Sequence, residues 1–340
     1  MKANNKNIFG RTNLQVTSMG FGAAPIGNFL KPIDEEVSAT MITEAFNFGL
    51  NYFDTAPYYG NGLSEVRLGS ALRWMERDSY IVSSKVGRIL KPKLRKDIDF
   101  TPWVNGLPFE IEYDYSYDGV MRSYEDSLQR MGIERYEIAF IHDIDIFTHG
   151  PEEQKVHFNN AMNGAYKALL KLREEGIIKA IGVGVNEWQV CYEALKMGDF
   201  DCFLLAGRYT LLEQDSLDEF FPLCEKRNVA VVIGGGYNSG ILATGSKKGA
   251  KYNYAPAPEH IHEKVREIEN CCRVYEVTLA AAALQFILAH PNVPTVIPGT
   301  RTVDQLKQNI ELIDEKIPLD FWKSLKQQNL IREDAPTPAS

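Results

Sequence analysis

Four side chains that could together transfer a proton beside a carbonyl group lie in the first half of the chain. Asp54 and Tyr59 belong to the segment Asp54-Thr55-Ala56-Pro57-Tyr58-Tyr59-Gly60, whereas Lys85 and His142 each follow an apolar run. A tyrosine with an ordinary pKa near 10 transfers protons poorly at neutral pH unless a nearby ammonium stabilises its phenolate. Lys85, paired with Asp54, could do this, and His142 could donate a hydrogen bond to the substrate oxygen. Each residue alone has a purely structural explanation, but together they favour catalysis.

The elements that position these residues alternate between short β-branched runs and longer stretches of helical periodicity, which predicts βαβ units and a parallel sheet. The expected strands are Ser18–Phe21, Leu50–Phe53, Tyr80–Ser84, Glu137–Ile141, Ile178–Val183, Cys202–Leu205, Val229–Ile233 and Pro294–Ile297. The expected helices are Asp34–Phe48, Ser64–Met75, Tyr117–Met131, His157–Glu175, Glu187–Met197, Asp215–Arg227, Glu259–His290 (as two helices) and Val303–Ile313. Eight strands, each followed by a helix, predict an α/β fold of the (β/α)8 TIM barrel type. Its strands open onto one catalytic face, where the four side chains would converge.

Two segments, Gly87–Ser116 and Gly234–Pro258, are longer than most connections in compact domains. Both follow expected strands, so we expect long loops that cover substrate or cofactor at the C-terminal face of the barrel. Residues 1–333 are expected to form a single catalytic domain and residues 334–340 a disordered tail.

The composition of the 340-residue chain excludes several other classes of protein. Its net charge of −8 argues against nucleic-acid and anionic-membrane binding, and no apolar run is long enough for a membrane span. The five cysteines are odd in number and form no Cys-x-x-Cys motif, which favours a reducing, cytoplasmic location. No metal is expected: His260 and His262 would face different sides of a helix, and Asp143, Asp145 and His149 are better explained as a solvated loop.

The motif set resembles the aldo-keto reductase superfamily. The resemblance rests on Asp54–Gly60, Ser83-Ser84-Lys85, Phe140-Ile141-His142 and Ile297-Pro298-Gly299-x-Arg301, and extends from Leu14 to about Leu312. It implies a (β/α)8 barrel and a nicotinamide cofactor that lies extended across the strand ends without a Rossmann domain. It also implies that Tyr59 is the proton donor or acceptor, supported by Asp54, Lys85 and His142.

The resemblance also implies the cofactor contacts. Asn186 would hold the carboxamide, although the serine that usually precedes this asparagine is missing here, and Tyr237 would stack on the nicotinamide. Backbone at Gly234 and Gly240 could approach the pyrophosphate, and the helix that opens after Gly299, Thr300 and Arg301 suits an anion. Gln305, Gln308 and Asn309 fall at the adenosine-contact spacing. Because Gly299 and Gln305 stand where strong NADP users have lysine and arginine, NAD is favoured over NADP, although Arg301 could bind a 2′-phosphate.

Within the superfamily, Tyr115-Ser116-Tyr117-Asp118 and His142-Asp143-Ile144-Asp145 are most similar to the branch of L-fucose (D-threo-aldose) 1-dehydrogenases, L-galactose dehydrogenases and pyridoxal 4-dehydrogenases. Their substrates are cyclic hemiacetals that are oxidised to lactones. The resemblance therefore predicts a dehydrogenase of carbohydrate metabolism that acts on the hemiacetal carbon of an aldose, as a monomer or small homo-oligomer, with Tyr58, Trp103 and Phe109 covering the sugar ring.

Three alternatives remain open at this point. The same site could serve a pyridoxal 4-dehydrogenase or an NADPH-dependent reductase of small aldehydes or ketones. A nucleotide-sensing subunit with very slow turnover is the third.

Overall fold

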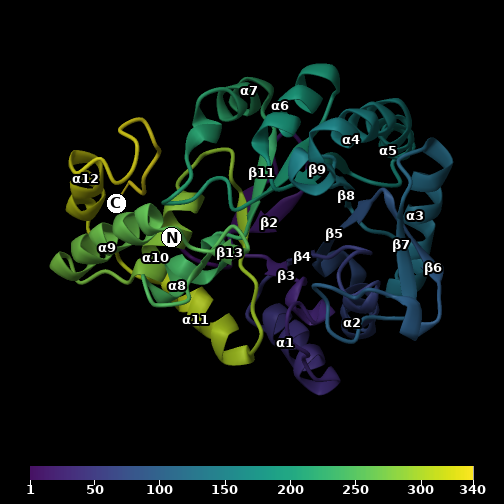
Figure 1. Cartoon of the computed structure of the whole chain (residues 1–340), viewed down its shortest axis with the longest axis horizontal. Helices are drawn as coiled ribbons and strands as arrows, with labels where there is room; N and C mark the ends of the chain where they lie inside the picture. The colour runs from purple at the N-terminus through teal and green to yellow at the C-terminus, as the bar shows by residue number, and fades with distance from the viewer. Residues whose placement is uncertain (340) are drawn as a thin grey trace.

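The computed structural model describes residues 1–339 and contains an eight-stranded parallel sheet that closes into a barrel (Figure 1). Around the barrel the strands are β3 (Phe21–Gly22), β4 (Tyr52–Asp54), β5 (Ile81–Val86), β8 (Ile138–His142), β9 (Ala180–Val185), β10 (Cys202–Ala206), β11 (Ala230–Gly234) and β14 (Thr295–Ile297). The seam between β14 and β3 is closed by parallel bridges, Met19 to Val296 and Gly22 to Gly299. The predicted (β/α)8 barrel is confirmed.

Every expected strand is present, and most extend one or two residues further toward the carboxyl end than predicted. Asp54 and His142 are consequently the last residues of β4 and β8, and Lys85 is the penultimate residue of β5. These polar side chains resemble loop residues in the sequence, but their backbones still belong to the parallel ladder. A rigid sheet therefore holds them, which suits side chains that must keep a fixed geometry.

Side chains alternate between two cores, as expected for strands of a barrel. Residues that face inward, such as Tyr52, Phe140 and Val232, form one cluster, which Phe9 and Val16 of the N-terminal hairpin cap at its amino end. That hairpin pairs β1 (Lys6–Ile8) with β2 (Gln15–Thr17). The larger core lies between the outside of the sheet and the helices.

The helices surround the sheet. They are α1 (Glu35–Asn47), α2 (Leu63–Leu72), α3 (Tyr117–Met131), α4 (Ile146–Asn160), α5 (Tyr166–Glu174), α6 (Trp188–Met197), α7 (Phe220–Arg227), α8 (Ile241–Thr244), α9 (Glu259–Val274), α10 (Leu279–Leu288), α11 (Val303–Asp314) and α12 (Leu319–Gln327). The helix expected from His157 begins eleven residues earlier, at Ile146, because Asp145 caps it by accepting a hydrogen bond from the backbone of Thr148 (3.1 Å). The proline that interrupts the pattern, Pro151, coincides with a kink at Gly150.

Both long segments contain short hairpins that the sequence does not predict. β6 (Arg88–Pro92) pairs with β7 (Phe109–Tyr113), and β12 (Lys251–Tyr252) pairs with β13 (Ala255–Pro256). In Figure 1 the β6–β7 hairpin stands at the edge of the molecule beside α3, on the side away from α9 and α12. Both hairpins follow the carboxyl end of a barrel strand.

The end of the chain differs from the predicted disordered tail at its first residues. Asp334 forms an ion pair with Arg332 (2.8 Å), and Ala335 is buried against the core. Ser340 lies outside the described residues. In the described part of the chain, α9 and α10 meet the length and hydropathy criteria for a membrane span only as a pair, and they are bent by 99°.

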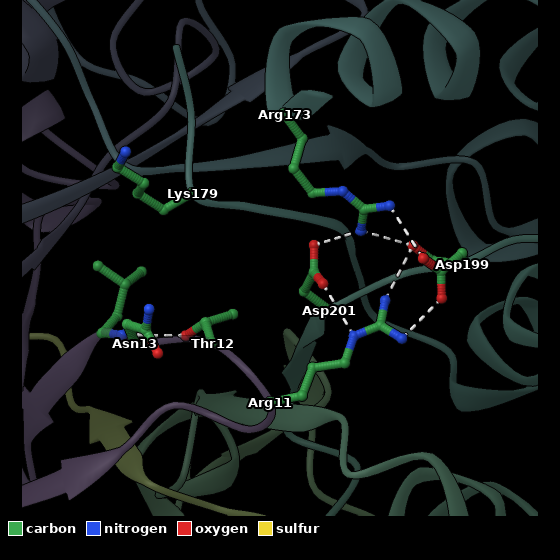
Figure 2. A pocket seen from close by; sticks show the side chains of 8 residues that line it. Arg11, Thr12, Asn13, Arg173, Lys179, Asp199 and Asp201 are labelled. Atoms are coloured by element: carbon green, nitrogen blue, oxygen red, sulfur yellow. Dashed lines mark hydrogen bonds and ion pairs between the residues drawn. The ribbon is translucent and has the colours of Figure 1, made fainter. Parts of the chain in front are cut away.

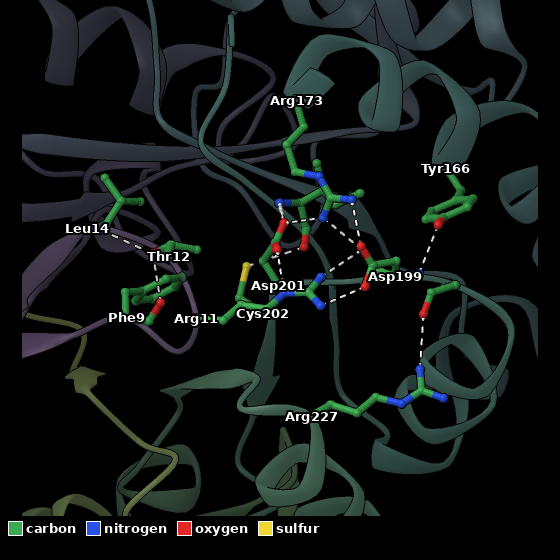
Figure 3. A network of polar contacts seen from close by, with 12 residues as sticks. Phe9, Arg11, Thr12, Leu14, Tyr166, Arg173, Asp199, Asp201, Cys202 and Arg227 are labelled. Atoms are coloured by element: carbon green, nitrogen blue, oxygen red, sulfur yellow. Dashed lines mark hydrogen bonds and ion pairs between the residues drawn. The ribbon is translucent and has the colours of Figure 1, made fainter. Parts of the chain in front are cut away.

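A hollow of about 570 Å³ lies at the amino end of the barrel, opposite the four candidate catalytic residues (Figure 2). Four of its five charged side chains pair with one another: Arg11 and Arg173 each contact both Asp199 and Asp201, at 2.6–3.0 Å. Asp201 also accepts a hydrogen bond from the backbone of Ile181 (3.0 Å). Figure 3 shows that this network continues to Tyr166, whose hydroxyl accepts from the backbone of Asp199. At this end of a barrel such a network is best explained as structural support.

Candidate active site

Asp54 and Lys85 form a buried ion pair between neighbouring strands. Lys85 Nζ lies 2.8 Å and 3.0 Å from the two carboxylate oxygens and also donates to the carbonyl of Thr55 (2.9 Å). The hydroxyl of Ser83 donates to Asp54 Oδ1 (2.7 Å). Burial raises the pKa of Asp54, and the ammonium offsets part of this rise. Burial also opposes the charge of Lys85, but Asp54 and Tyr59 outweigh it and raise the pKa of Lys85, which stays protonated.

Tyr59 lies against this pair. The ammonium of Lys85 is 4.7 Å from the centre of the Tyr59 ring, close enough for its charge to act on the phenol. Burial raises the pKa of Tyr59 to about 12, the positive charge of Lys85 opposes that rise, and the negative charge of Asp54 adds to it. The phenol is therefore protonated at neutral pH, and Lys85 is the group that makes its ionisation less costly.

The loop that carries Tyr59 is held by close backbone contact with the loop after β3. Gly60 has φ of 67°, and a Cβ atom there would lie 2.4 Å from the carbonyl oxygen of Gly27. A Cβ at Gly27 would in turn lie 2.7 Å from the backbone of Tyr59. Only glycine permits this approach. Arg67 of α2 holds the other side of the loop after β3 by donating to the carbonyls of Ile26 (2.7 Å) and Ile33 (2.8 Å).

His142 completes the group at the end of β8. Its ring centre lies 6.1 Å from those of both Tyr58 and Tyr59, and its side chain is buried. Burial lowers the pKa of His142 well below its ordinary value, and the nearby cations Arg88 and Lys85 lower it further. The imidazole is thus neutral at physiological pH and can donate through only one nitrogen. Nδ1 has no hydrogen-bond partner among the described residues.

An aromatic wall, defined as Phe29, Tyr58, Trp103, Phe147 and Tyr254, extends outward from this group. Neighbouring rings within it have centres 5.1–6.5 Å apart, and Trp103 is 5.5 Å from Tyr59. These residues follow five different strands, four of them in loops and Phe147 in the first turn of α4. Tyr254 and Phe147 are about half exposed, at 50% and 51%. An exposed group of aromatic side chains beside buried polar groups is typical of a ligand site.

Two members of this wall, Tyr58 and Trp103, are predicted substrate contacts, and the structure brings both beside Tyr59. The third, Phe109, is the first residue of β7 and pairs with Pro92, at the end of the hairpin that is farther from Arg88. Phe29 and Phe147 were not predicted, because an isolated aromatic residue gives no periodic signal, whereas Tyr254 belongs to the segment Gly234–Pro258 that was expected to cover substrate or cofactor. Their position after strands β3, β8 and β11 is the one feature that could have indicated them.

Asp143 and Arg88 form a second buried ion pair next to His142. Arg88 Nη2 donates to Asp143 Oδ2, which lies 3.3 Å from His142 Nε2. The expectation of a solvated loop at Asp143, Asp145 and His149 is wrong for the two aspartates, which are 7% and 0% exposed. Asp143 is paired with Arg88. Asp145 accepts hydrogen bonds from the backbone N–H groups of Thr148, as the cap of α4, and of Asn186 (2.8 Å). An aspartate after a strand resembles a turn residue, and its distant arginine partner leaves no local pattern.

The predicted cofactor residues lie along the carboxyl edges of β9, β11 and β14. Asn186 follows β9, and its side chain accepts a hydrogen bond from the hydroxyl of Tyr254 (3.2 Å). Gly234 ends β11, and Gly240 has open space where a Cβ would stand. Tyr237 donates its hydroxyl to Asn309 of α11 (2.8 Å), so its side chain is oriented toward that helix.

The start of α11 fits an anionic group. The hydroxyl of Thr300 is buried without a partner among the described residues, and α11 begins three residues later behind its cap, Thr302. An unpartnered hydroxyl beside a helix N-terminus suits a phosphate oxygen. Gln305 donates its backbone N–H to Thr302 and accepts from the backbone of Arg301, whereas Gln308 is exposed on the same helix and Gly299 lies beside Pro25.

The guanidinium of Arg301 is already engaged. It donates to the carbonyls of Phe29 (2.9 Å) and Lys31 (2.8 Å) in the loop after β3. A contact with a 2′-phosphate would require Arg301 to release this loop. The residues at the start of α11 thus fit a phosphate group of the cofactor, and in this conformation Arg301 does not contribute to that site.

Comparisons with known proteins agree with this geometry. The sequence profile of the Aldo/keto reductase family matches residues 18–329. The chain is 41% identical to the pyridoxal 4-dehydrogenase of Microbacterium luteolum over 97% of its own length and 99% of that protein. It is 35% identical to the D-threo-aldose 1-dehydrogenase of a Pseudomonas species, covering 96% of each chain.

Solved structures show the same fold. An aldo-keto reductase from Bacillus halodurans in its holo form superposes with a TM-score of 0.74 at 24% identity, covering 96% of each chain. The glycerol dehydrogenase of Gluconobacter oxydans gives a TM-score of 0.72 at 19% identity, covering 99% of this chain and 98% of that one. With the profile match over most of its length, the chain is an oxidoreductase of the aldo/keto reductase family.

Proposed function

We propose that this protein is an NAD(P)-dependent dehydrogenase that oxidises the hemiacetal carbon of a small cyclic substrate to a lactone. The observation that carries the proposal is the contact of Tyr59 with the buried Lys85–Asp54 pair at the base of the aromatic wall. Two relatives that cover nearly the whole chain are named as dehydrogenases, one of pyridoxal and one of aldoses, and both kinds of substrate form cyclic hemiacetals.

In this proposal Tyr59 removes the proton from the hemiacetal hydroxyl. Lys85 stabilises the phenolate that accepts it, and Asp54 keeps the ammonium charged in the barrel interior. The neutral imidazole of His142 donates a hydrogen bond to the substrate oxygen and so fixes its direction. A bound oxidised nicotinamide supplies the acceptor for the hydride that leaves the carbon. Asn186, Thr300 and the start of α11 would hold that cofactor.

Of the two substrate classes, we rank the hemiacetal of pyridoxal first and an aldose such as L-fucose, L-galactose or D-arabinose second. Rings that follow five different strands converge at the site, and flat aromatic substrates gain most from such a wall. The relative at 41% identity carries the pyridoxal name, which supports the same order. NAD is the proposed cofactor, because Arg301 is committed to the loop after β3 and no lysine or arginine stands at Gly299 or Gln305.

The test is to follow nicotinamide reduction at 340 nm with NAD and NADP separately, over pyridoxal, L-fucose, L-galactose and D-arabinose. We expect oxidation of at least one, and we expect Tyr59→Phe to lower kcat by roughly 10²- to 10⁴-fold without lowering the unfolding temperature. Phenylalanine keeps the ring contacts with Trp103 and His142, so it is a matched variant. Failure with all four substrates, together with rapid NADPH consumption by small aldehydes, would favour the reductase.

A further inference from the structure

The backbone of Asp143 is held in an unusual conformation immediately after His142. Its φ of 49° is left-handed, a conformation that L-residues rarely adopt. Three hydrogen bonds enforce it: the N–H donates to Gly184 O (3.0 Å), and the carbonyl accepts from the Tyr115 hydroxyl (2.9 Å) and His149 Nε2 (2.7 Å). Left-handed residues that persist in this way cluster at functional sites.

The consequence of this turn is that the carboxylate of Asp143 faces the neighbouring imidazole. Asp143 Oδ2 lies 3.3 Å from His142 Nε2 and at the same time accepts from Arg88 Nη2. Arg88 cannot easily move, because its guanidinium lies between the rings of Tyr58 (3.9 Å to the ring centre) and Tyr113 (4.7 Å). The side chains of Arg88 and Asp143 are only 6% and 10% exposed. The β6–β7 hairpin and the loop after β4 thus hold one carboxylate against the imidazole.

A neutral imidazole has one N–H, and its surroundings decide which nitrogen carries it. A lone pair on Nε2 would be repelled by the carboxylate 3.3 Å away, whereas an N–H there is attracted to it. Nδ1, on the other side of the ring, has no acceptor that would favour a proton, since it has no partner among the described residues.

We propose that Arg88 and Asp143 are positioning residues that keep the single proton of His142 on Nε2 and fix the orientation of its ring. The carboxylate acts on the imidazole, and the guanidinium holds the carboxylate in place. At 3.3 Å the carboxylate attracts the proton to Nε2 without a short hydrogen bond, so the N–H stays available to a substrate oxygen while the ring keeps its orientation. The inference rests on the proposed function only for the role of His142 in catalysis.

The tautomer can be measured directly in the protein without substrate or cofactor. We would label the six histidines with ¹⁵N, record long-range ¹H–¹⁵N spectra, and assign His142 from the signals lost in His142→Gln. In the wild-type protein we expect the pattern of an imidazole protonated on Nε2. In Asp143→Asn we expect the Nδ1–H form to become populated, and kcat to fall about 10- to 100-fold while KM for the nicotinamide is unchanged.

Glu137→Gln is the matched control. Glu137 lies just before the same strand, β8, at its other end, and forms a similarly buried ion pair with Arg77 (2.7 Å). Its substitution should lower stability while it leaves the His142 spectrum and kcat unchanged. Arg88→Met should shift the tautomer of His142 in the same direction as Asp143→Asn. It replaces Asp143→Asn as the test if that variant does not fold.

Three results would overturn the inference: a wild-type His142 protonated on Nδ1, an unchanged tautomer in both variants, or an equal loss of kcat in Glu137→Gln. Failure of the proposed function is distinguishable from each of these. If no hemiacetal is oxidised, the wild-type spectrum still decides the tautomer, and the variants can be compared with any aldehyde that the enzyme reduces.

Discussion

The rate of oxidation should depend steeply on pH because Tyr59 must lose its proton before it can accept one. Burial, opposed by Lys85, gives its phenol a pKa of about 12. Oxidation needs the phenolate and reduction needs the phenol, so the two directions should respond to pH in opposite ways. We therefore expect kcat/KM for oxidation to rise with pH through the neutral and mildly alkaline range.

The magnitude follows from the fraction of phenolate. With a pKa of about 12, that fraction is roughly 10⁻⁵ at pH 7 and 10⁻³ at pH 9, so kcat/KM should rise about 100-fold over these two units. The positive charge of a bound oxidised nicotinamide lowers the pKa, so the rise levels off below pH 12. Reduction of an aldehyde should be nearly flat over the same range, because the phenol stays protonated.

The assay is nicotinamide absorbance at constant ionic strength from pH 6.5 to 10, with the folded state checked at each pH by intrinsic fluorescence. Tyr59→Phe is the control, since its residual oxidation should lose the tenfold rise per pH unit. A wild-type profile that is flat between pH 7 and 9 would refute the reasoning, as would an equal slope in Tyr59→Phe.

Three further predictions concern stability and cofactor choice. Burial lowers the pKa of His290 to about 4, whereas the pKa in the unfolded chain is near 6.5, so the unfolded chain takes up the proton first as the pH falls. The contribution of neutral His290 to stability is therefore complete above pH 6.5 and falls by up to about 3 kcal/mol toward pH 4. Over this range the unfolding temperature of His290→Asn should decline less than that of the wild-type protein. Asp201→Ala should lower the free energy of unfolding by about 3 kcal/mol in urea titrations, because it leaves Arg11, Arg173 and the Ile181 N–H without their shared acceptor. The kcat of this variant should be unchanged, and an altered kcat would show that the amino end of the barrel also affects catalysis. Arg301→Ala should lower kcat/KM with NAD and NADP by similar factors, since its guanidinium supports the loop after β3; a loss confined to NADP would instead indicate contact with the 2′-phosphate.

The barrel and the meeting of Asp54, Tyr59, Lys85 and His142 could be predicted because both follow from a local pattern and one topological rule. Each strand is a short apolar run, and parallel strands in a barrel present their carboxyl ends to one face. The catalytic roles of the four residues stay predictions. Their proximity in space, by contrast, could be predicted once the strand ends were located to within two residues.

What could not be predicted depends on contacts between segments far apart in the sequence. Arg88 and Asp143 are separated by 55 residues, and neither sits in a pattern that distinguishes a buried ion pair from two solvated charges. The β6–β7 hairpin is similarly hidden, because Arg88–Pro92 carries charges that resemble a loop, yet Arg88 is buried between two tyrosines. Tertiary context overrides local preference at both places.

The two arginines that grip the loop after β3 have a consequence for how ligands reach the site. Arg67 and Arg301 donate to five carbonyls of this loop, so the backbone at Phe29 loses its conformational freedom when the protein folds. Tyr254 packs edge-on against Phe29 (6.5 Å between ring centres), but it is half exposed and is held by contacts with the side chains of Asn186 and Ser239. Ordering a residue costs about 1–2 kcal/mol of conformational entropy, and here Tyr254 incurs that cost when the ligand binds. Release of the product should therefore begin with movement of Tyr254, while Phe29 stays in place.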